Sequence, residues 1–201
     1  MVATRKTDAR LDLTDAGHHV ERVFGLTGPN AAGKGEVGAY LERRGFRLHS
    51  LSDVVREEAA ARGLPPEREH LIRVGNELRR SGGAGVLAER MIGRLGQRDV
   101  VDSIRNPAEV DVLRRLPQFV LLGIDAPVEV RFRRSLERAR PGDPRTVEDF
   151  RRREAQENTS DPTAQRLEAT FRLADHVVDN GATLDDLHHR IDGLLGILGD
   201  V

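Results

Sequence analysis

The chain has 201 residues, and its 32 Lys and Arg against 33 Asp and Glu give a formal net charge of −1. This length favours one globular domain, and the balanced charge provides no overall attraction to nucleic acid or anionic lipid. Cysteine is absent, which excludes disulfides, thiolate nucleophiles and Cys-ligated zinc. No apolar run approaches membrane-spanning length and no signal-peptide pattern opens the chain, so we expect a cytoplasmic protein without a membrane partner.

Short apolar segments alternate with helical patterns along the chain. Residues 1–20 are polar and lack a clear period, so we expect a disordered tail before a single domain over residues 21–201. Strands are predicted at residues 23–27, 46–48, 100–102, 119–124 and 176–178. Helices are predicted at residues 33–44, 52–62, 67–80, 84–95, 107–116, 127–140, 146–157, 162–173 and 184–198. This alternation predicts an α/β fold whose parallel sheet of about five strands is covered by helices on both faces.

Three residues mark predicted helix ends. Gly45 suits the position after the first helix, because glycine readily adopts the left-handed conformation there. Ser52 is expected to cap the second helix, and Asn106 is expected to cap the helix that begins at Pro107.

A glycine-rich loop separates the first strand from the first helix. Residues 28–35, with the sequence GPNAAGKG, fit the pattern GxxxxGK of a phosphate-binding loop. Its backbone N–H groups would surround phosphate oxygens, and the following helix directs its positive end at the same point. The strand–loop–helix context favours this interpretation over an ordinary glycine turn, and it predicts a three-layer P-loop NTPase fold. The residues expected to bind ATP are Gly28, Asn30, Ala31, Ala32, Gly33, Lys34, Gly35 and Glu36.

Lysine is rare in this chain, because only Lys6 and Lys34 occur among the 32 basic residues. Codon usage in a GC-rich genome explains the excess of arginine but not the position of Lys34, which would reach the β- and γ-phosphates. The Ser or Thr that usually follows this lysine and contacts Mg²⁺ is replaced by Gly35, and Glu36 comes next. The loop resembles that of adenylate kinases, which also carry GKG but follow it with threonine. Water or another carboxylate would therefore hold the Mg²⁺ ion.

The segment after the second strand resembles the acceptor-binding segment of adenylate kinases. Asp53 and Arg56 lie three residues apart on one helix face, and the resemblance implies that Arg56, with Ser52 beside it, binds the acceptor phosphate. A capped helix with a surface ion pair is the structural alternative. Arg79, which follows Gly75 on the next helix, is a candidate second acceptor contact or a solvated residue.

The strand at residues 100–102 ends in Asp102, which gives a Walker-B-like arrangement. A carboxylate there would lie beside the phosphate loop and position Mg²⁺ or its waters. Arg105 follows at the spacing seen in nucleoside monophosphate kinases, and this resemblance implies a contact with the acceptor phosphate. The alternative for Asp102 is a polar residue that simply ends the strand.

Nine arginines occur within residues 131–153, on two predicted helices separated by a Pro- and Gly-containing break. In nucleotide kinases such a helical hairpin closes over the triphosphate and stabilises its charge, so we expect a lid at about residues 128–158. The favoured lid residues are Arg134, Arg138 and Arg140, with Arg153 on the second helix. Binding of RNA or DNA phosphates is the alternative, although five acidic residues dilute the positive charge.

The end of the chain resembles dephospho-CoA kinases, in which a short strand ends in Asn-Gly before the last helix. This resemblance implies that Asn180 lies near the donor adenine, while an Asn-Gly turn alone is the structural alternative.

From residue 22 to 198 the chain is similar to the nucleotide-kinase group of P-loop proteins. The implied activity is ATP- and Mg²⁺-dependent phosphoryl transfer to a small nucleotide, with (deoxy)nucleoside monophosphates as the favoured acceptors. An acceptor phosphate is already a nucleophile, whereas a hydroxyl acceptor, as in dephospho-CoA kinases, would make Asp53 the candidate base. A nucleic-acid-directed kinase and a nucleotide-binding switch with weak catalysis are two further hypotheses.

Overall fold

The computed structural model describes residues 21–139, 142–158, 161 and 164–200. The predicted tail over residues 1–20 and the candidate lid residue Arg140 lie outside this part of the chain. The sheet contains five parallel strands in the order β2-β3-β1-β4-β5, which confirms the predicted parallel sheet. The strands are β1 (Arg22–Thr27), β2 (Arg47–Ser50), β3 (Arg98–Asp102), β4 (Phe119–Asp125) and β5 (His176–Asp179).

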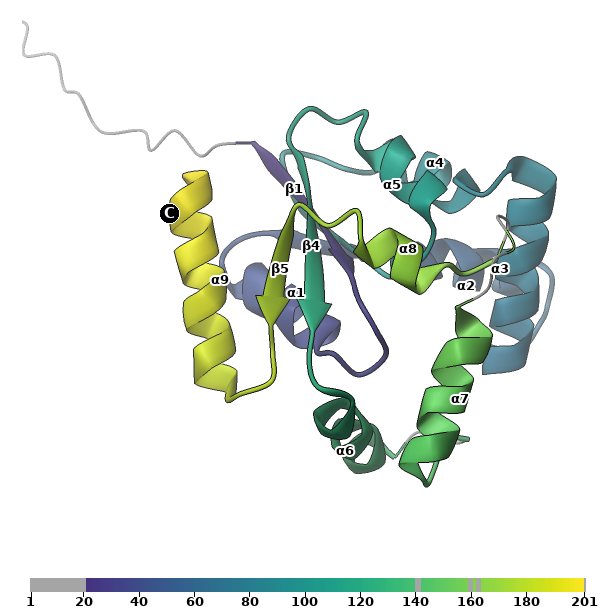
Figure 1. The fold of residues 1–201 in the computed structure, drawn as a ribbon. Coiled ribbons are helices and arrows are strands. Elements are labelled where there is room, and N and C mark those ends of the chain that lie inside the picture. The colour runs from purple at the N-terminus through teal and green to yellow at the C-terminus, as the bar shows by residue number, and fades with distance from the viewer. Residues whose placement is uncertain (1–20, 140–141, 159–160, 162–163, 201) are drawn as a thin grey trace, which may run out of the picture.

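Helices cover both faces of the sheet, as predicted for a three-layer fold (Figure 1). The helices are α1 (Lys34–Arg43), α2 (Leu51–Ala61), α3 (Arg68–Gly82), α4 (Val86–Ile92), α5 (Pro107–Leu113), α6 (Val128–Arg138), α7 (Val147–Glu157), α8 (Leu167–Phe171) and α9 (Leu184–Leu198). Helices α1 and α9 pack on one face, whereas α2, α3, α4, α5 and α8 pack on the other. Helices α6 and α7 lie beyond the carboxyl ends of the strands (Figure 1). No described helix is long and apolar enough to cross a membrane.

The core forms two apolar layers because successive strand residues point to opposite faces of the sheet. In β1, Val23 packs with the layer under α2 to α5, and Phe24 packs with the layer under α1 and α9. The neighbouring pair Val100 and Val101 in β3 alternates in the same way. Both faces of the central strands β1, β3 and β4 are therefore largely buried, which explains their apolar runs, whereas the edge strands β2 and β5 are partly exposed.

The structure corrects one predicted helix cap. Ser50, not Ser52, is the N-cap of α2, because the Ser50 hydroxyl accepts the backbone N–H of Ser52 at 3.3 Å. Asn106 caps α5 as predicted, in a capping box with Glu109. Gly45 follows α1 with a positive φ of 85°, also as predicted.

Helix α8 is shorter than the predicted span of residues 162–173. Two groups just before it are bonded to the loop after β3 instead of to a helical turn. The Ala164 carbonyl accepts the Asn106 side-chain amide at 2.8 Å, and the Arg166 N–H donates to the Arg105 carbonyl at 2.8 Å. The chain that returns from α7 is therefore fastened to the loop after β3.

Candidate active site

The phosphate loop requires glycine at two positions. Gly28 has φ 136°, and a Cβ added there would lie 2.1 Å from the carbonyl oxygen of Ile124. Gly33 has φ 102°, and a Cβ there would lie 2.1 Å from Nδ2 of Asn180. Both the left-handed backbone and the close neighbours exclude a side chain. The loop therefore keeps its shape only with glycine at both ends of the motif.

Lys34 begins α1 and folds back over the loop. Its Nζ donates to the carbonyl oxygens of Gly28 at 2.7 Å and Pro29 at 2.9 Å. Burial of the ammonium and, next, the positive charge of Arg105 lower the pKa of Lys34 to about 8, against a smaller opposing effect of Asp102. The ammonium is thus held at the loop in an environment that favours an incoming negative charge.

Asn180 connects the end of β5 to the phosphate loop. Its buried amide donates from Nδ2 to the Ala32 carbonyl at 2.8 Å, and its Oδ1 accepts from Nη2 of Arg134 at 3.4 Å. The group predicted to face the adenine is therefore engaged in holding the loop. The other terminal nitrogen of Arg134, Nη1, is buried without a hydrogen-bond partner in the described residues, so it can bind an additional anion.

Asp102 lies at the carboxyl end of β3, next to Ser103, which has a positive φ of 66°. Among the described residues, Oδ1 of Asp102 is buried and has no hydrogen-bond partner. An unpartnered carboxylate beside a phosphate loop fits Mg²⁺, which binds through one or two carboxylates and keeps several waters. No cluster of three or more candidate ligand side chains occurs in the described ranges, so phosphates and water would complete the coordination of such an ion.

Gly35 and Glu36 do not supply the missing loop hydroxyl. A Cβ added at Gly35 would meet no atom within 4 Å, so the absence of a side chain there has no steric cause. Glu36 lies 3.6 Å from Arg43 and 3.5 Å from His188. Its carboxylate therefore pairs with Arg43 on α1 and lies beside the His188 ring of α9.

A cavity of about 710 Å³, here called the loop cavity, adjoins the phosphate loop. It brings together the loop, the end of β3 and the α6–α7 hairpin. Predicted site residues supply much of its lining, namely Asn30, Ala31, Gly33, Lys34, Gly35, Glu36, Ser52, Arg56, Asp102, Arg105, Arg134, Arg138 and Arg153.

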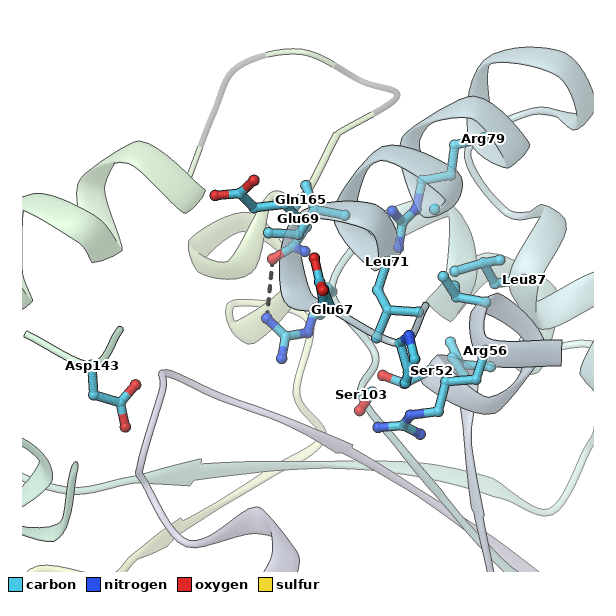
Figure 2. A pocket seen from close by; sticks show the side chains of 16 residues that line it. Ser52, Arg56, Glu67, Glu69, Leu71, Arg79, Leu87, Ser103, Asp143 and Gln165 are labelled. Carbon is cyan, nitrogen blue, oxygen red and sulfur yellow. Dashed lines mark hydrogen bonds between the residues drawn. The ribbon is translucent and has the colours of Figure 1, made fainter. Parts of the chain in front are cut away.

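A second cavity of about 730 Å³, here called the α2–α3 cavity, lies between these helices and the loop after β3 (Figure 2). Aliphatic side chains form one wall, namely Leu51, Val55, Leu71, Ile72 and Leu87. Polar residues complete the lining, namely the basic Arg56, Arg79 and Arg105, the acidic Glu67, Glu69 and Asp143, and Ser52, Ser103 and Gln165. Five residues line both cavities, namely Ser52, Arg56, Ser103, Arg105 and Asp143, so the two cavities adjoin.

The α6–α7 hairpin is tied to the phosphate loop by Arg131 and Asn30. Arg131 forms an ion pair with Glu154 and donates from Nη1 to the Asn30 carbonyl at 3.2 Å. The Asn30 side chain donates to Glu157 at 2.7 Å. The hairpin therefore lies against the loop, although sequence reasoning did not single out Arg131.

The predicted acceptor residues occupy different environments. Asp53 and Arg56 form a half-exposed ion pair at 2.5 Å, and Asp53 is not part of the described lining of either cavity. Arg105 donates from Nη1 to Gln165 at 3.0 Å. Arg79 is buried and bonded to Glu109.

Comparison with known proteins identifies the family. A family model described as an AAA domain matches residues 27–151. A UPF0200 protein of Hyperthermus butylicus is 32% identical over 177 residues, which cover 86% of this chain and 92% of that protein. A UPF0200 protein of Pyrococcus horikoshii is 32% identical over 176 residues, covering 83% and 92%. The chain belongs to the UPF0200 family and carries an AAA domain.

Solved structures share the fold of this UPF0200 member at low sequence identity. TT1252 from Thermus thermophilus has a TM-score of 0.59 and 21% identity, and the match covers 89% of this chain and 98% of that one. Shikimate kinase from Acinetobacter baumannii, in complex with shikimate, has a TM-score of 0.57 and 17% identity, covering 90% and 96%. A gluconokinase from Sinorhizobium meliloti has a TM-score of 0.54 and 14% identity, covering 90% and 95%. The UPF0200 chain therefore has a P-loop kinase-like fold.

Besides Arg131, three residues of the UPF0200 site were not found by sequence reasoning. Glu109 had a signal, because Asn106 followed by Glu three residues later is a capping-box pattern, but that pattern does not predict a bond to Arg79. Ser103 had no signal in the sequence, because its positive φ is unusual for a residue other than glycine. The position of Gln165 in the site depends on the path of the chain after α7, and no local sequence pattern encodes that path.

Proposed function

We propose that this UPF0200 protein transfers the γ-phosphoryl group of ATP to a small acceptor that carries a phosphate, with (deoxy)nucleoside monophosphates as the favoured class. The supporting observation is the junction of two cavities at shared cationic residues. Arg56 and Arg105 line both the loop cavity and the α2–α3 cavity. An acceptor phosphate bound by these arginines would lie next to the γ-phosphate of a nucleotide in the loop cavity.

The α2–α3 cavity supports an acceptor with a heterocyclic body. Its aliphatic wall favours a group that buries apolar surface, whereas a fully hydroxylated acid would lose hydration there. A nucleoside monophosphate combines such a body with the anionic group that Arg56 and Arg105 require. It also matches a lining in which an aliphatic wall adjoins a junction that carries Arg56 and Arg105 beside one carboxylate, Asp143.

Positioning and electrostatics would carry the reaction, because phosphoryl transfer to a phosphate oxygen needs no strong base. Lys34 would exchange its bonds to loop carbonyls for β- and γ-phosphate oxygens. Arg134 on α6 would add a second donor through Nη1, which has no hydrogen-bond partner among the described residues. When bound near Asp102, Mg²⁺ would neutralise phosphate charge. The α6–α7 hairpin would limit the access of water to the transferring group.

The position of Asp53 makes hydroxyl phosphorylation the weaker alternative. A general base must reach the proton that it removes. The Asp53 carboxylate is instead paired with Arg56 and is absent from the described lining of both cavities.

A nucleotide-binding switch with weak catalysis is the second candidate. Gly35 favours it, because the loop offers no hydroxyl to Mg²⁺ although a side chain would fit at this position. Such a protein would bind ATP in the same loop cavity but would not accelerate transfer to an acceptor.

A coupled ADP-release assay across nucleoside and deoxynucleoside monophosphates and dephospho-CoA tests the proposal. We expect turnover with one or more monophosphates and none with dephospho-CoA. Arg105→Lys should raise the KM for the acceptor about tenfold or more, because lysine lacks the bidentate fork. Arg115→Lys, at an exposed residue paired with Glu89, is the matched control. Tight ATP binding, measured by calorimetry, without turnover on any acceptor would contradict the proposed kinase activity and favour the nucleotide-binding switch.

A further inference from the structure

Arg79 differs in location from the other two arginines of the α2–α3 cavity. Arg56 and Arg105 line both cavities, whereas Arg79 lines only the α2–α3 cavity. Figure 2 shows Arg79 apart from Arg56 and Ser103, which are at the junction. An acceptor phosphate must lie at the junction to meet the γ-phosphate. Arg79 is therefore placed beside the part of an acceptor that points away from the reaction.

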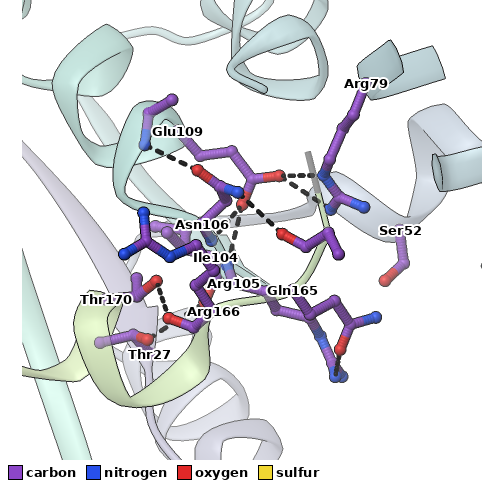
Figure 3. A network of polar contacts seen from close by, with 12 residues as sticks. Thr27, Ser52, Arg79, Ile104, Arg105, Asn106, Glu109, Gln165, Arg166 and Thr170 are labelled. Atoms are coloured by element: carbon purple, nitrogen blue, oxygen red, sulfur yellow. Dashed lines mark hydrogen bonds and ion pairs between the residues drawn. The ribbon is translucent and has the colours of Figure 1, made fainter. Parts of the chain in front are cut away.

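The charge of Arg79 is already neutralised. Its Nε and Nη2 donate to Oε1 of Glu109 at 3.2 and 2.9 Å, and both side chains are almost fully buried (Figure 3). The other carboxylate oxygen, Oε2, accepts the backbone N–H groups of Arg105 at 2.8 Å and Asn106 at 3.1 Å. The guanidinium is thus fixed in orientation and does not need an anion as a partner.

One nitrogen of Arg79 remains available. Within the described part of the chain, the hydrogen bonds of Arg79 are made by Nε and Nη2 and not by Nη1. Nη1 lies 3.5 Å from the point where a Cβ at Gly75 would be. Gly75 and Arg79 both line the cavity, and Val55 is the other near neighbour of that point. Because Gly75 has no side chain, no Cβ covers Nη1 at this point of the cavity lining, where the aliphatic Val55 is its neighbour.

We infer that Arg79, fixed by Glu109, is a specificity-determining residue that donates from Nη1 to a carbonyl oxygen or ring nitrogen on the acceptor's heterocycle. This inference rests on the proposed function and assigns the base, not the phosphate, to Arg79. A donor held in an apolar slot rejects a ligand that leaves it unpaired, because the buried N–H then loses its water without gaining a partner. The expected discrimination between bases that do and do not present an acceptor atom there is about 10- to 100-fold.

Calorimetric titration of the nucleotide-free protein tests this inference without depending on turnover. The ligands are AMP, GMP, CMP, UMP, dTMP and ribose 5-phosphate, which has the phosphate and sugar but no base. The variants are Arg79→Lys, which keeps the charge without the planar fork, and Arg79→Met with Glu109→Gln, which removes both buried charges together. Gly75→Ala is a third variant, because the added methyl group would meet Nη1 and Val55 at ordinary contact distances.

Wild-type protein should prefer one or two bases by about tenfold or more over ribose 5-phosphate. The Arg79 variants and Gly75→Ala should reduce that preference to less than threefold and change ribose 5-phosphate affinity little. Arg105→Lys should instead weaken all six ligands by a similar factor. A base preference that survives in folded Arg79→Lys and Gly75→Ala overturns the inference, as does an equal loss for every ligand. Selective binding without phosphorylation would overturn only the proposed kinase function.

Discussion

Lys34 is held between two backbone carbonyls that fit a compact ammonium. Its Nζ lies 2.7 Å from the Gly28 oxygen and 2.9 Å from the Pro29 oxygen. The planar guanidinium of arginine is wider and cannot point all its donors into this space. Lys34→Arg should therefore fold normally but lose phosphoryl transfer by about 100-fold or more, the usual effect of removing one preorganised donor.

Steady-state kinetics and thermal unfolding of Lys34→Arg measure these two effects. Arg43→Lys, at an exposed position on the same helix, is the control and should change neither quantity. Full activity in Lys34→Arg would contradict the assignment of Lys34 to the phosphates.

The depressed pKa of Lys34 predicts that nucleotide binding takes up protons. With a pKa of about 8 in the free protein, Lys34 is only partly protonated at pH 8 and above. A bound phosphate stabilises the ammonium and raises this pKa, so ADP binding should take up roughly half a proton at pH 8 and almost none at pH 6.5. ADP affinity should accordingly fall as pH rises from 8 to 10.

Calorimetry of ADP binding in two buffers with different ionisation enthalpies measures the proton uptake directly. Lys34→Met has no titrating group at this position and should lose the uptake at pH 8. An equal uptake in Lys34→Met would assign the effect to another group.

At the scale of elements, the side chain of Asn180 connects the end of β5 to the phosphate loop. The Asn180 amide donates to the buried Ala32 carbonyl at 2.8 Å. Asn180→Ala leaves this carbonyl without its partner and should lower the free energy of unfolding by about 1 to 3 kcal/mol. ATP affinity should fall with it, because the loop loses a support.

Two measurements on Asn180→Ala distinguish two roles of this residue. Urea denaturation gives the free energy of unfolding, and titration with ADP and with GDP compares the two affinities. A structural support weakens both nucleotides equally and lowers stability. A changed ratio of ADP to GDP affinity with unchanged stability would instead support the predicted adenine contact.

The elements themselves were largely predictable, since the central strands contain apolar runs and the longer sheet-covering helices have an apolar period. The span of α8 was not, because its sequence pattern extends beyond the five residues that form the helix. The position of the site was predictable too, because the phosphate loop and Asp102 lie at the carboxyl ends of parallel strands, which meet at one edge of the sheet. The packing between distant helices was not. The bond from Arg79 to Glu109 joins α3 to α5, and the Gln165 contact depends on where the chain returns from α7. Neither contact leaves a periodic signal in the sequence.

At the scale of the whole molecule, ion pairs neutralise part of the positive charge in the described residues of the arginine-rich hairpin. Four of its arginines form ion pairs with acidic residues of the same segment, namely Arg131 with Glu154, Arg138 with Asp143, Arg151 with Glu129 and Arg152 with Asp149. Two others, Arg134 and Arg153, line the loop cavity. The hairpin therefore directs Arg134 and Arg153 inward, where a triphosphate would lie. On its outer surface the exposed Arg133 and Arg145 are matched in number by the exposed Glu137 and Glu148.

This charge distribution predicts weak binding to nucleic acid. Nonspecific binding requires several cations that can each release a counterion from the phosphate backbone. The pairing of the hairpin arginines and the net charge of −1 provide few of them. Fluorescence anisotropy with labelled 20-mers of single-stranded DNA and RNA should therefore show a Kd weaker than about 100 μM at 150 mM salt. Tighter binding that weakens steeply with salt and is lost in Arg151→Glu with Arg152→Glu would favour a nucleic-acid-directed kinase, because those substitutions leave the loop cavity intact.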